Sequence, residues 1–277
     1  MNLSALVPKT AWLPLTPRGV AAFARARWSR LFLVQLIVAL VAAGTVGWFL
    51  WAVWFPTIGT AIANLPEQSQ IKDGTLVWPR ESPCVLAENH FLSLAVDLDH
   101  TGQATTTSPV RIEFGRHDWQ VSSLLGTLHL PRLLNTDYPH GYVIAFSRSN
   151  LGPWWQAREP FLVALAVLGA GLYLLFSWAV LATVYFVPAW LVAFFMNREL
   201  TWGGSWRLAG AALLPGALLM AVAILLYGLQ WLDFIRLGLA FCLHLVIAWI
   251  YLLVGPLFLP RVAEVSSPVK NPFAGPS

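Results

Sequence analysis

The sequence has few charged residues. Only 11% of its 277 residues are Asp, Glu, Lys or Arg, whereas 57% are hydrophobic. Soluble globular domains have roughly 25% charged and 45–50% apolar residues. The solvent for much of this chain is therefore expected to be lipid, and neither a soluble enzyme nor a nucleic-acid binder fits the composition.

Cysteine is equally scarce. The two cysteines are Cys84, in a polar region, and Cys242, inside an apolar run. A disulfide between them would have to join a residue of the polar insert to one inside a predicted membrane span. The sequence therefore predicts neither a disulfide framework nor a cysteine-rich metal ribbon. Cys84 is interpreted as a small apolar packing residue.

The charges that are present are unevenly distributed. Residues 55–159 contain seven basic and ten acidic residues, a net charge of −3, although the whole chain carries +4. The remainder therefore carries +7, and short basic flanks of membrane spans stay on the cytoplasmic side. This asymmetry predicts a polar extracytoplasmic insert and cytoplasmic termini.

Long runs without charge predict four transmembrane helices. Each is long enough for a hydrocarbon layer of about 30 Å. The expected order is a basic cytoplasmic tail with an interfacial helix, the first span, an extracytoplasmic domain, three further spans and a flexible cytoplasmic tail. The corresponding ranges are 1–30, 31–55, 56–159, 160–197, 208–229, 237–259 and 260–277. Asp233 and Arg236 mark the outer turn between the last two spans and could form an i, i+3 pair.

The apolar block at 161–196 allows two readings. It is too long for one perpendicular span and short for two, and Pro188 divides it. One span leaves Arg198 and Arg207 inside, whereas a helical hairpin places them outside. We therefore expect one span with a kinked inner extension, and the hairpin is the alternative.

The segment before the first span predicts a short helix. Thr16-Pro17 is typical of an N-cap followed by proline at the first helical position. Val20, Phe23 and Ala24 then recur at helical spacing, which suggests an interfacial helix. A plain basic flank is the alternative. Ala61-Ile62-Ala63 resembles a cleavage site, but the apolar run before it is longer than a signal-peptide core, so we expect an uncleaved anchor.

Alternating apolar and polar residues in the insert predict half-buried β-strands. The clearest runs are 92–98 and 110–114. Further strands are expected at 75–78, 84–87, 119–122 and 142–146, with turns at Asp73-Gly74, Thr101-Gly102 and His140-Gly141. The predicted fold class is thus a four-helix transmembrane bundle with a β-rich (α+β) extracytoplasmic domain between the first and second spans.

Two aspartates lie at the end of the strand predicted at 92–98. Asp97-Leu98-Asp99-His100-Thr101 resembles the first motif of haloacid-dehalogenase-type phosphatases, which implies a nucleophilic Asp97 and an acid/base Asp99 with magnesium. The insert lacks the parallel βαβ run of those enzymes, and its only lysine is upstream. We therefore expect an ordinary strand-to-turn segment in which Asp99 and Thr101 satisfy turn amides.

Five histidines lie in the same insert: His90, His100, His117, His129 and His140. With Asp97 or Asp99 they could hold zinc, but none has an HxH, HxxxH or CxxC spacing. Structural or solvated roles are expected, with no metal and no cofactor.

Within the predicted spans the candidate positions are few. His244 is an ionisable intramembrane residue, for which Gln35, Ser177 or Thr183 are candidate hydrogen-bond partners. No carboxylate lies within a span, which argues against a proton-coupled carrier or ion channel. Gly169, Gly171 and Gly216 permit close helix contact, either inside the bundle or with another subunit.

The order of one span, about a hundred residues and three spans resembles an uncharacterised bacterial four-span integral-membrane family sometimes described as maltodextrin-utilisation accessory proteins. The segments that carry the resemblance are 65–66, 71–76, 96–102, 206–209 and 214–216. It covers roughly residues 30–260 and implies the topology, without an established activity.

The sequence therefore predicts a non-catalytic, multi-pass protein of the bacterial inner membrane with both termini cytoplasmic. It would be an accessory or scaffold subunit that contacts the lipid bilayer. We expect it to bind a membrane-protein partner or to self-associate, and we do not expect it to bind nucleic acid. One alternative is an accessory component of solute uptake, for which the family resemblance implies sugars as the solute. Four tryptophans could stack on sugar rings, namely Trp78, Trp119, Trp154 and Trp155. A membrane-bound phosphatase is the other alternative.

Overall fold

The computed structural model describes residues 15–102, 108–123 and 134–262. Its helical elements are α1 (Pro17–Phe23), α2 (Trp28–Phe49), the π-helix η3 (Leu50–Trp54), α3 (Phe55–Ala63), α4 (Arg148–Phe195), α5 (Trp202–Ala212), α6 (Leu214–Gly228), α7 (Phe234–Val254) and the 3₁₀ helix η5 (Gly255–Phe258). Its strands are β1 (Gln70–Lys72), β2 (Thr75–Val77), β3 (Cys84–Glu88), β4 (Leu92–Val96), β5 (Val110–Phe114), β6 (Asp118–Ser123), β7 (Leu134–Asp137) and β8 (Val143–Ala145). Residues 1–14 and 263–277 of the predicted tails, and His129, lie outside the described residues.

Four helical segments of the described chain are long and apolar enough to cross a membrane. They are Trp28–Ala63, Arg148–Phe195, Trp202–Gly228 and Phe234–Phe258. Each overlaps one predicted span and begins before it, since helical hydrogen bonding does not start where the apolar residues start. The first also ends after its predicted span, whereas the other three end one or two residues before theirs. Asp233 lies between the last two segments, and its Oδ2 lies 3.5 Å from Nε of Arg236 in the first turn of α7, as an i, i+3 pair.

The block at 161–196 belongs to one continuous helix. α4 has 48 residues, begins at Arg148 and passes Pro188 without ending. A helix of this length measures about 72 Å, more than twice the thickness of a hydrocarbon layer. The helical hairpin is therefore not the structure of this segment.

Two compact units can be distinguished, and each is described separately. The first comprises residues 1–39, 173–220 and 241–277. Its core joins α1, the beginning of α2, the end of α4, α5, the beginning of α6 and α7. Buried members of this core are Leu31, Ala182, Leu208, Leu214 and Leu252. α5 and α6 are separated at Leu213 because Pro215 has no N–H to donate to the Ala211 carbonyl.

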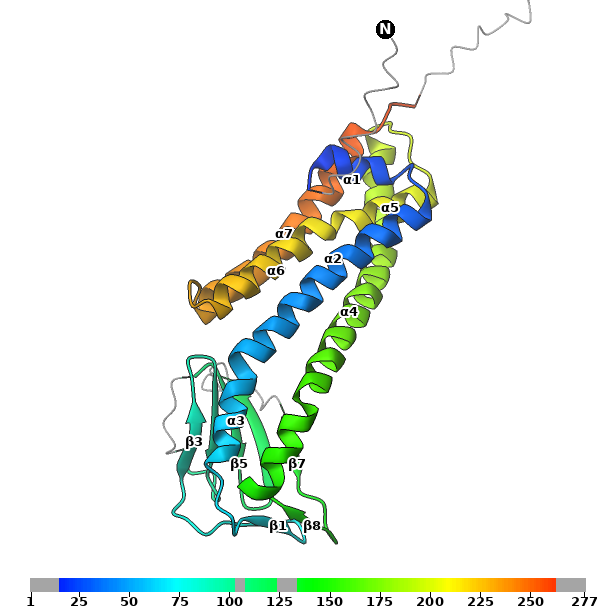
Figure 1. The fold of residues 1–277 in the computed structure, drawn as a ribbon. Helices are drawn as coiled ribbons and strands as arrows, with labels where there is room; N and C mark the ends of the chain where they lie inside the picture. Colours follow the sequence, from blue (N-terminus) through cyan, green and yellow to red (C-terminus); the bar gives the residue numbers. More distant parts are fainter. Residues whose placement is uncertain (1–14, 103–107, 124–133, 263–277) are drawn as a thin grey trace, which may run out of the picture. The chain divides into compact units, whose positions relative to one another are not determined.

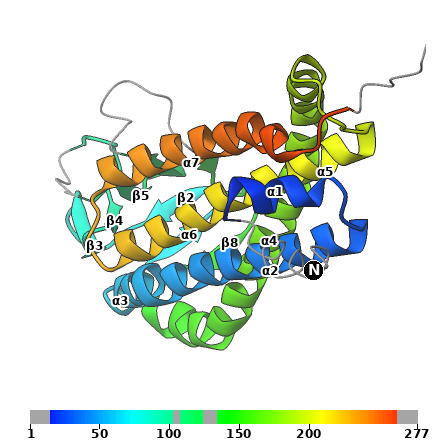
Figure 2. The same ribbon diagram turned by 90° about the horizontal axis from the view of Figure 1, so that it is seen from above.

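The predicted N-terminal cap of α1 is confirmed. Thr16 Oγ1 accepts a hydrogen bond from Gly19 N at 3.1 Å, and Pro17 occupies the first helical position. The apolar face of α1 is not an interfacial surface, however. Val20 and Phe23 are buried, and α1 packs against α5 and η5 (Figure 2). A turn at Ala24–Ala26 also separates it from α2.

The second unit comprises residues 40–172 and 221–240 and contains both sheets. Strands β2-β1-β8 form one sheet and β3-β4-β5-β6-β7 the other. All neighbouring strands are antiparallel except β4 and β5, which are parallel. β1 and β7 were not predicted. The prediction of a half-buried strand was wrong for β4, since all five of its residues are buried.

The core of the β-rich part includes the end of α3. Leu92, Leu94 and Val96 of β4 pack in one cluster with Ala61 of α3 and with Leu65. Figure 1 shows α3 lying along the five-stranded sheet. The predicted domain boundary at residue 56 therefore falls inside a helix whose end belongs to the domain core.

Candidate functional site

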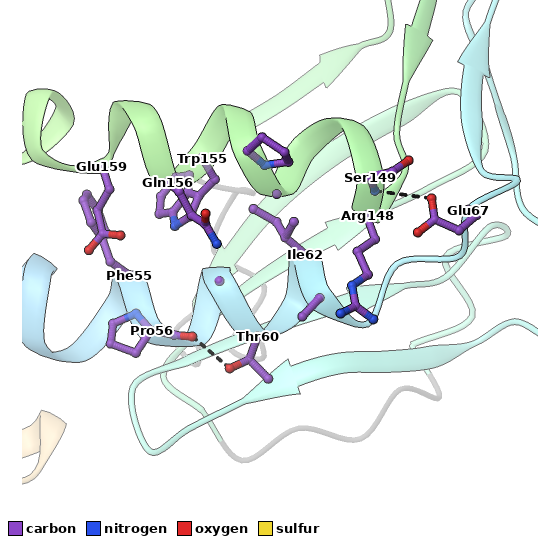
Figure 3. Close-up of a pocket in the computed structure, with 14 residues that line it drawn as sticks. Phe55, Pro56, Thr60, Ile62, Glu67, Arg148, Ser149, Trp155, Gln156 and Glu159 are labelled. Atoms are coloured by element: carbon purple, nitrogen blue, oxygen red, sulfur yellow. Dashed lines mark hydrogen bonds between the residues drawn. The ribbon is translucent and has the colours of Figure 1, made fainter.

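A groove lies between α3 and the first turns of α4. It has a volume of about 620 Å³. Figure 3 shows Glu67, Arg148 and Ser149 at one end, and Phe55 and Glu159 at the other. Both walls are helical, and both belong to the second unit.

The polar end of the groove combines a helix N-terminus with charges of both signs. The Ser149 backbone N–H donates to Glu67 Oε2 at 3.3 Å. This carboxylate therefore occupies the position where the dipole of α4 favours an anion. Arg148, the first residue of α4, is exposed and lines the groove beside it. This end thus offers both a cation and an acceptor to a polar ligand.

Trp155 supplies the aromatic surface of the groove. Its ring packs edge-on against Phe55 at a centroid distance of 5.0 Å. The other three tryptophans considered for sugar stacking do not line it. Trp78 and Trp119 pack against the apolar cluster of the sheets, and Arg158 lies over the ring of Trp154 at 4.7 Å. The structure therefore leaves one of the four as a stacking surface in this groove.

Asp97 organises the turn after β4. Its Oδ2 accepts hydrogen bonds from Thr101 Oγ1 and Gly102 N, both at 3.0 Å. Burial alone would raise the pKa of this carboxyl group, but these bonds and the backbone N–H of Asp99 lower it below its ordinary value. Asp97 is only 1% exposed.

The expectation that Asp99 and Thr101 satisfy the turn amides was therefore wrong in detail. Asp97 takes that role, while Asp99 pairs with Arg116 at 3.1 Å on the surface. Among the described residues the two carboxylates do not face a common open site, because the first is buried and hydrogen-bonded within its own turn and the second lies on the surface.

A partly buried polar cluster, which the sequence did not predict, lies beside this turn. His100 has a positive φ of 51° and places its ring between two carboxylates. Nδ1 lies 2.6 Å from Glu113 Oε1, and Nε2 lies 2.7 Å from Asp118 Oδ1. Arg111 Nη2 lies 2.5 Å from the other oxygen of Glu113. Gln120 Nε2 lies 3.0 Å from Glu113 Oε1 and 2.8 Å from His100 Nδ1. We call these five residues the His100 cluster.

The His100 cluster favours a protonated imidazole. Burial alone would lower the pKa of His100, but the hydrogen bonds and charges of Asp118 and Glu113 raise it above its ordinary value. Both ring nitrogens then donate to a carboxylate, and neither is left as a base or metal ligand. These ion pairs therefore join the turn after β4 to the β5–β6 hairpin.

The described histidines do not gather around a cation. No group of three or more His, Cys, Asp or Glu side chains in the described part of the chain could hold a metal ion. In the His100 cluster the two carboxylates lie against opposite edges of one ring, so the three groups cannot converge on a single ion. His140 is largely exposed, and His117 Nδ1 lies 3.4 Å from the Gly74 carbonyl. Both cysteines are free, and burial raises the pKa of Cys84.

None of the partners proposed for His244 is bonded to it. Its Nδ1 lies against the Phe241 carbonyl of its own helix. Gln35 instead donates to the Gly210 carbonyl at 3.4 Å. Ser177 and Thr183 donate to carbonyls of their own helix. His244 and Gln35 therefore do not form one polar site.

The three candidate glycines have different surroundings. A Cβ at Gly216 would lie 2.5 Å from the His244 carbonyl oxygen, so α6 and α7 approach closely there. At Gly171 a Cβ would lie 3.8 Å from Ala43, and at Gly169 it would meet nothing within 4 Å. Of these three glycines, only Gly216 is required for a close backbone contact.

Comparisons with known proteins give no family assignment. No family model, no curated protein and no solved structure matches this chain. Functional inference therefore rests on the chain's own residues.

Proposed function

We propose that this chain is a multi-pass protein of the bacterial inner membrane with both termini in the cytoplasm. Four sufficiently long apolar helices support it. So does the charge distribution, because residues 55–159 are net acidic and the remaining residues are net basic. In this orientation the two sheets lie outside the cytoplasm.

The proposed role is a non-catalytic accessory or scaffold subunit that binds a partner protein through the β2-β1-β8 sheet. The observation that carries this proposal is the edge strand β8. All three of its residues are exposed, and the preceding Tyr142 is 68% exposed. β8 pairs only with β1 among the described strands. An exposed apolar edge is a template for a strand of another chain.

The hydrogen-bond pattern indicates which groups of β8 face a partner. Asp73 N donates to Tyr142 O at 3.1 Å, which makes this opposed pair a hydrogen-bonded one. Antiparallel pairs alternate between bonded and non-bonded. The next pair in the register, Lys72 and Val143, is therefore non-bonded. The N–H and C=O of Val143 point away from β1, toward the open edge.

Replacing Val143 by lysine is expected to abolish this docking. A charged side chain on an edge strand opposes pairing with an added strand. The test is copurification of the tagged full chain in mild detergent. A stoichiometric partner should accompany the wild-type protein and fall by about tenfold or more with Val143→Lys, which corresponds to roughly 1.4 kcal/mol.

Val77→Lys is the matched control. Val77 is exposed on the same face of the same sheet but lies on β2, at the opposite edge. The Val77→Lys variant should copurify with the partner to the same extent as the wild type. A wild-type protein that is repeatedly monomeric and free of partners would overturn the proposed role.

The groove at Trp155 favours one second candidate, an accessory component of solute uptake. An aromatic ring beside Arg148, Glu67 and Gln156 is a suitable surface for a sugar or another polar solute. A panel of glycans added to the full chain should then raise its thermal midpoint, and Trp155→Ala should remove the increase. Trp154→Ala, outside the groove, should retain it. No increase across the panel would eliminate this candidate. The burial of Asp97 supports neither a phosphatase nor a magnesium-dependent reaction at that residue.

A further inference from the structure

The groove between α3 and α4 contains four polar side chains that form no hydrogen bond or ion pair with any described residue. They are Arg148, Trp155, Gln156 and Glu159, all on α4. The ring of Trp155 contacts Phe55, but its indole N–H has no acceptor in the described part of the chain. The groove therefore offers donors and acceptors to a ligand that supplies their partners.

These polar groups follow one face of α4. Arg148, Gly152, Trp155 and Glu159 are spaced at i, i+4, i+7 and i+11, which is the spacing of one row along a helix. Figure 3 shows Arg148 and Glu159 at opposite ends of the groove, with Trp155 between them. Their positions on α4 are separated by about 16 Å along the helix axis. The row thus has a positive end, an aromatic middle and a negative end.

Glu67, the other acidic residue of the groove, is already bound within the chain. Its Oε2 accepts the Ser149 backbone N–H at 3.3 Å, so the N-terminus of α4 stabilises its charge. Glu67 and Arg148 do not form an ion pair with each other. The guanidinium of Arg148 therefore keeps its N–H donors for a carboxylate of a ligand.

Two glycines keep the groove open, one on each wall. A Cβ at Gly152 of α4 would meet nothing within 4 Å, and one at Gly59 of α3 would approach only Trp155 Nε1, at 3.9 Å. Glycine is typical of places where another backbone approaches closely. Much of the remaining lining is apolar, namely Phe55, Pro56, Ile62, Ala63 and Pro153. This space fits a narrow backbone that carries apolar side chains.

We infer that the groove binds an extended segment of the partner protein, with an acidic side chain at the Arg148 end and a basic side chain at the Glu159 end. An extended chain rises by about 3.3 Å per residue, so about five residues cover the distance between the two ends. The inference rests on the proposed partner protein and adds a second contact to it. β8 ends at Ala145, three residues before α4 begins at Arg148, so one partner chain can reach both surfaces.

The opposite charges favour a peptide over a neutral sugar in this groove. A sugar would use Trp155 and Gln156 but would leave Arg148 and Glu159 without partners. A peptide has a side chain for each charged end. It also has backbone C=O and N–H groups at regular spacing, which match the Trp155 indole N–H and the Gln156 amide.

The test is affinity selection of capped pentapeptides by the full chain in detergent micelles. Four equimolar pools differ in their first and last residues, namely Asp with Lys, Lys with Asp, Asp with Asp and Lys with Lys. Each pool has Ala, Leu or Phe at the three middle positions, and retained peptides are counted by mass spectrometry. The wild type should prefer a mixed-charge pool about tenfold over the two like-charge pools, because an exposed ion pair is lost and a repulsion of similar size is added.

Reversing one charge should change the selected pool. Arg148→Glu makes both ends of the groove acidic and should transfer the preference to the Lys-with-Lys pool. Glu159→Lys should transfer it to the Asp-with-Asp pool. The matched control is Arg158→Glu, since Arg158 is on the same helix but lies over the ring of Trp154 and does not line the groove. This variant should keep the wild-type preference. A newly acquired preference cannot result from unfolding.

Three results would overturn the inference. They are a wild type without a preference for either mixed-charge pool, the same preference in Arg148→Glu as in the wild type, and a transfer of preference by Arg158→Glu. Each leaves the copurification of the partner, and its loss with Val143→Lys, unaffected. A wild-type protein that never copurifies a partner would instead contradict the proposed function, whichever pool it retains.

Discussion

Replacing Gly216 by valine is expected to lower the thermal midpoint of the protein by roughly 8 °C. A Cβ at this position would lie 2.5 Å from the His244 carbonyl oxygen, which is a backbone atom of α7 and cannot rotate away. α6 and α7 would have to separate. Overpacking of this kind costs about 3 kcal/mol at the upper end of its usual range, and each kcal/mol lowers the midpoint of a large domain by about 2–4 °C.

Gly169→Val is the matched control for this substitution. The added side chain starts in open space, because a Cβ at Gly169 would meet nothing within 4 Å. Its effect should stay below about 0.5 kcal/mol, as for other surface changes. Intrinsic tryptophan fluorescence of the protein in detergent micelles measures both midpoints. Similar losses in the two variants would show that the α6–α7 contact at Gly216 has no special role.

The close contact at Gly216 also illustrates what the sequence could indicate. A small residue in an apolar run predicts close packing, but not against which helix. The same argument selected Gly169, where a Cβ would be in open space. Which glycine faces a neighbour depends on the rotation of each helix about its axis, and runs that are apolar all round carry little information about that rotation.

The strands were predictable where side chains alternate along them. β5 coincides with the predicted run at 110–114, β3 is one residue longer than predicted at its C-terminal end, and β6 is one residue longer at each end. β7 was missed because its residues, Leu134–Asp137, are all exposed and show no alternation. β4 was interpreted as half-buried, yet it is a central strand in which even Ser93 is buried. Small side chains such as Ser93 and Ala95 do not distinguish a covered face from an exposed one.

The His100 cluster could not be predicted from spacing. His100 lies 13 residues from Glu113 and 18 from Asp118, and the three meet only because β5 and β6 form a hairpin beside the turn after β4. One local signal was present. Gly115 lies in that hairpin, and a Cβ there would lie 2.3 Å from His100 Nε2, so only glycine leaves room for the ring.

His100→Ala is expected to destabilise the protein by about 3 kcal/mol near pH 6. The substitution leaves Glu113 and Asp118 facing each other without the cation between them, and their side chains are only 4% and 16% exposed. Removing one partner of a buried ion pair costs about 3–5 kcal/mol. The lower end applies because Arg111 still pairs with Glu113 and because the ring itself is 22% exposed. His140→Ala, which removes a largely exposed ring, should have almost no effect.

The loss should also depend on pH, with a sign that follows from the direction of the pKa. The pKa of His100 is raised in the folded protein, so the folded state binds its proton more tightly than the unfolded state does. The stabilisation is complete below the unfolded pKa of about 6.5 and is lost as the pH rises through the higher folded pKa. Above that pH the neutral ring can donate to only one of the two carboxylates.

Thermal midpoints of the wild type and His100→Ala should therefore converge as the pH rises from 6 to 9, while the wild type and His140→Ala remain close throughout. A difference between the wild type and His100→Ala that stays constant over this range would mean that the ring acts by packing alone. A difference that grows with pH would mean that the folded protein holds His100 neutral, with the two carboxylates bound in some other way. Convergence of the two midpoints would identify the His100 imidazolium as the group that holds the turn after β4 against the β5–β6 hairpin.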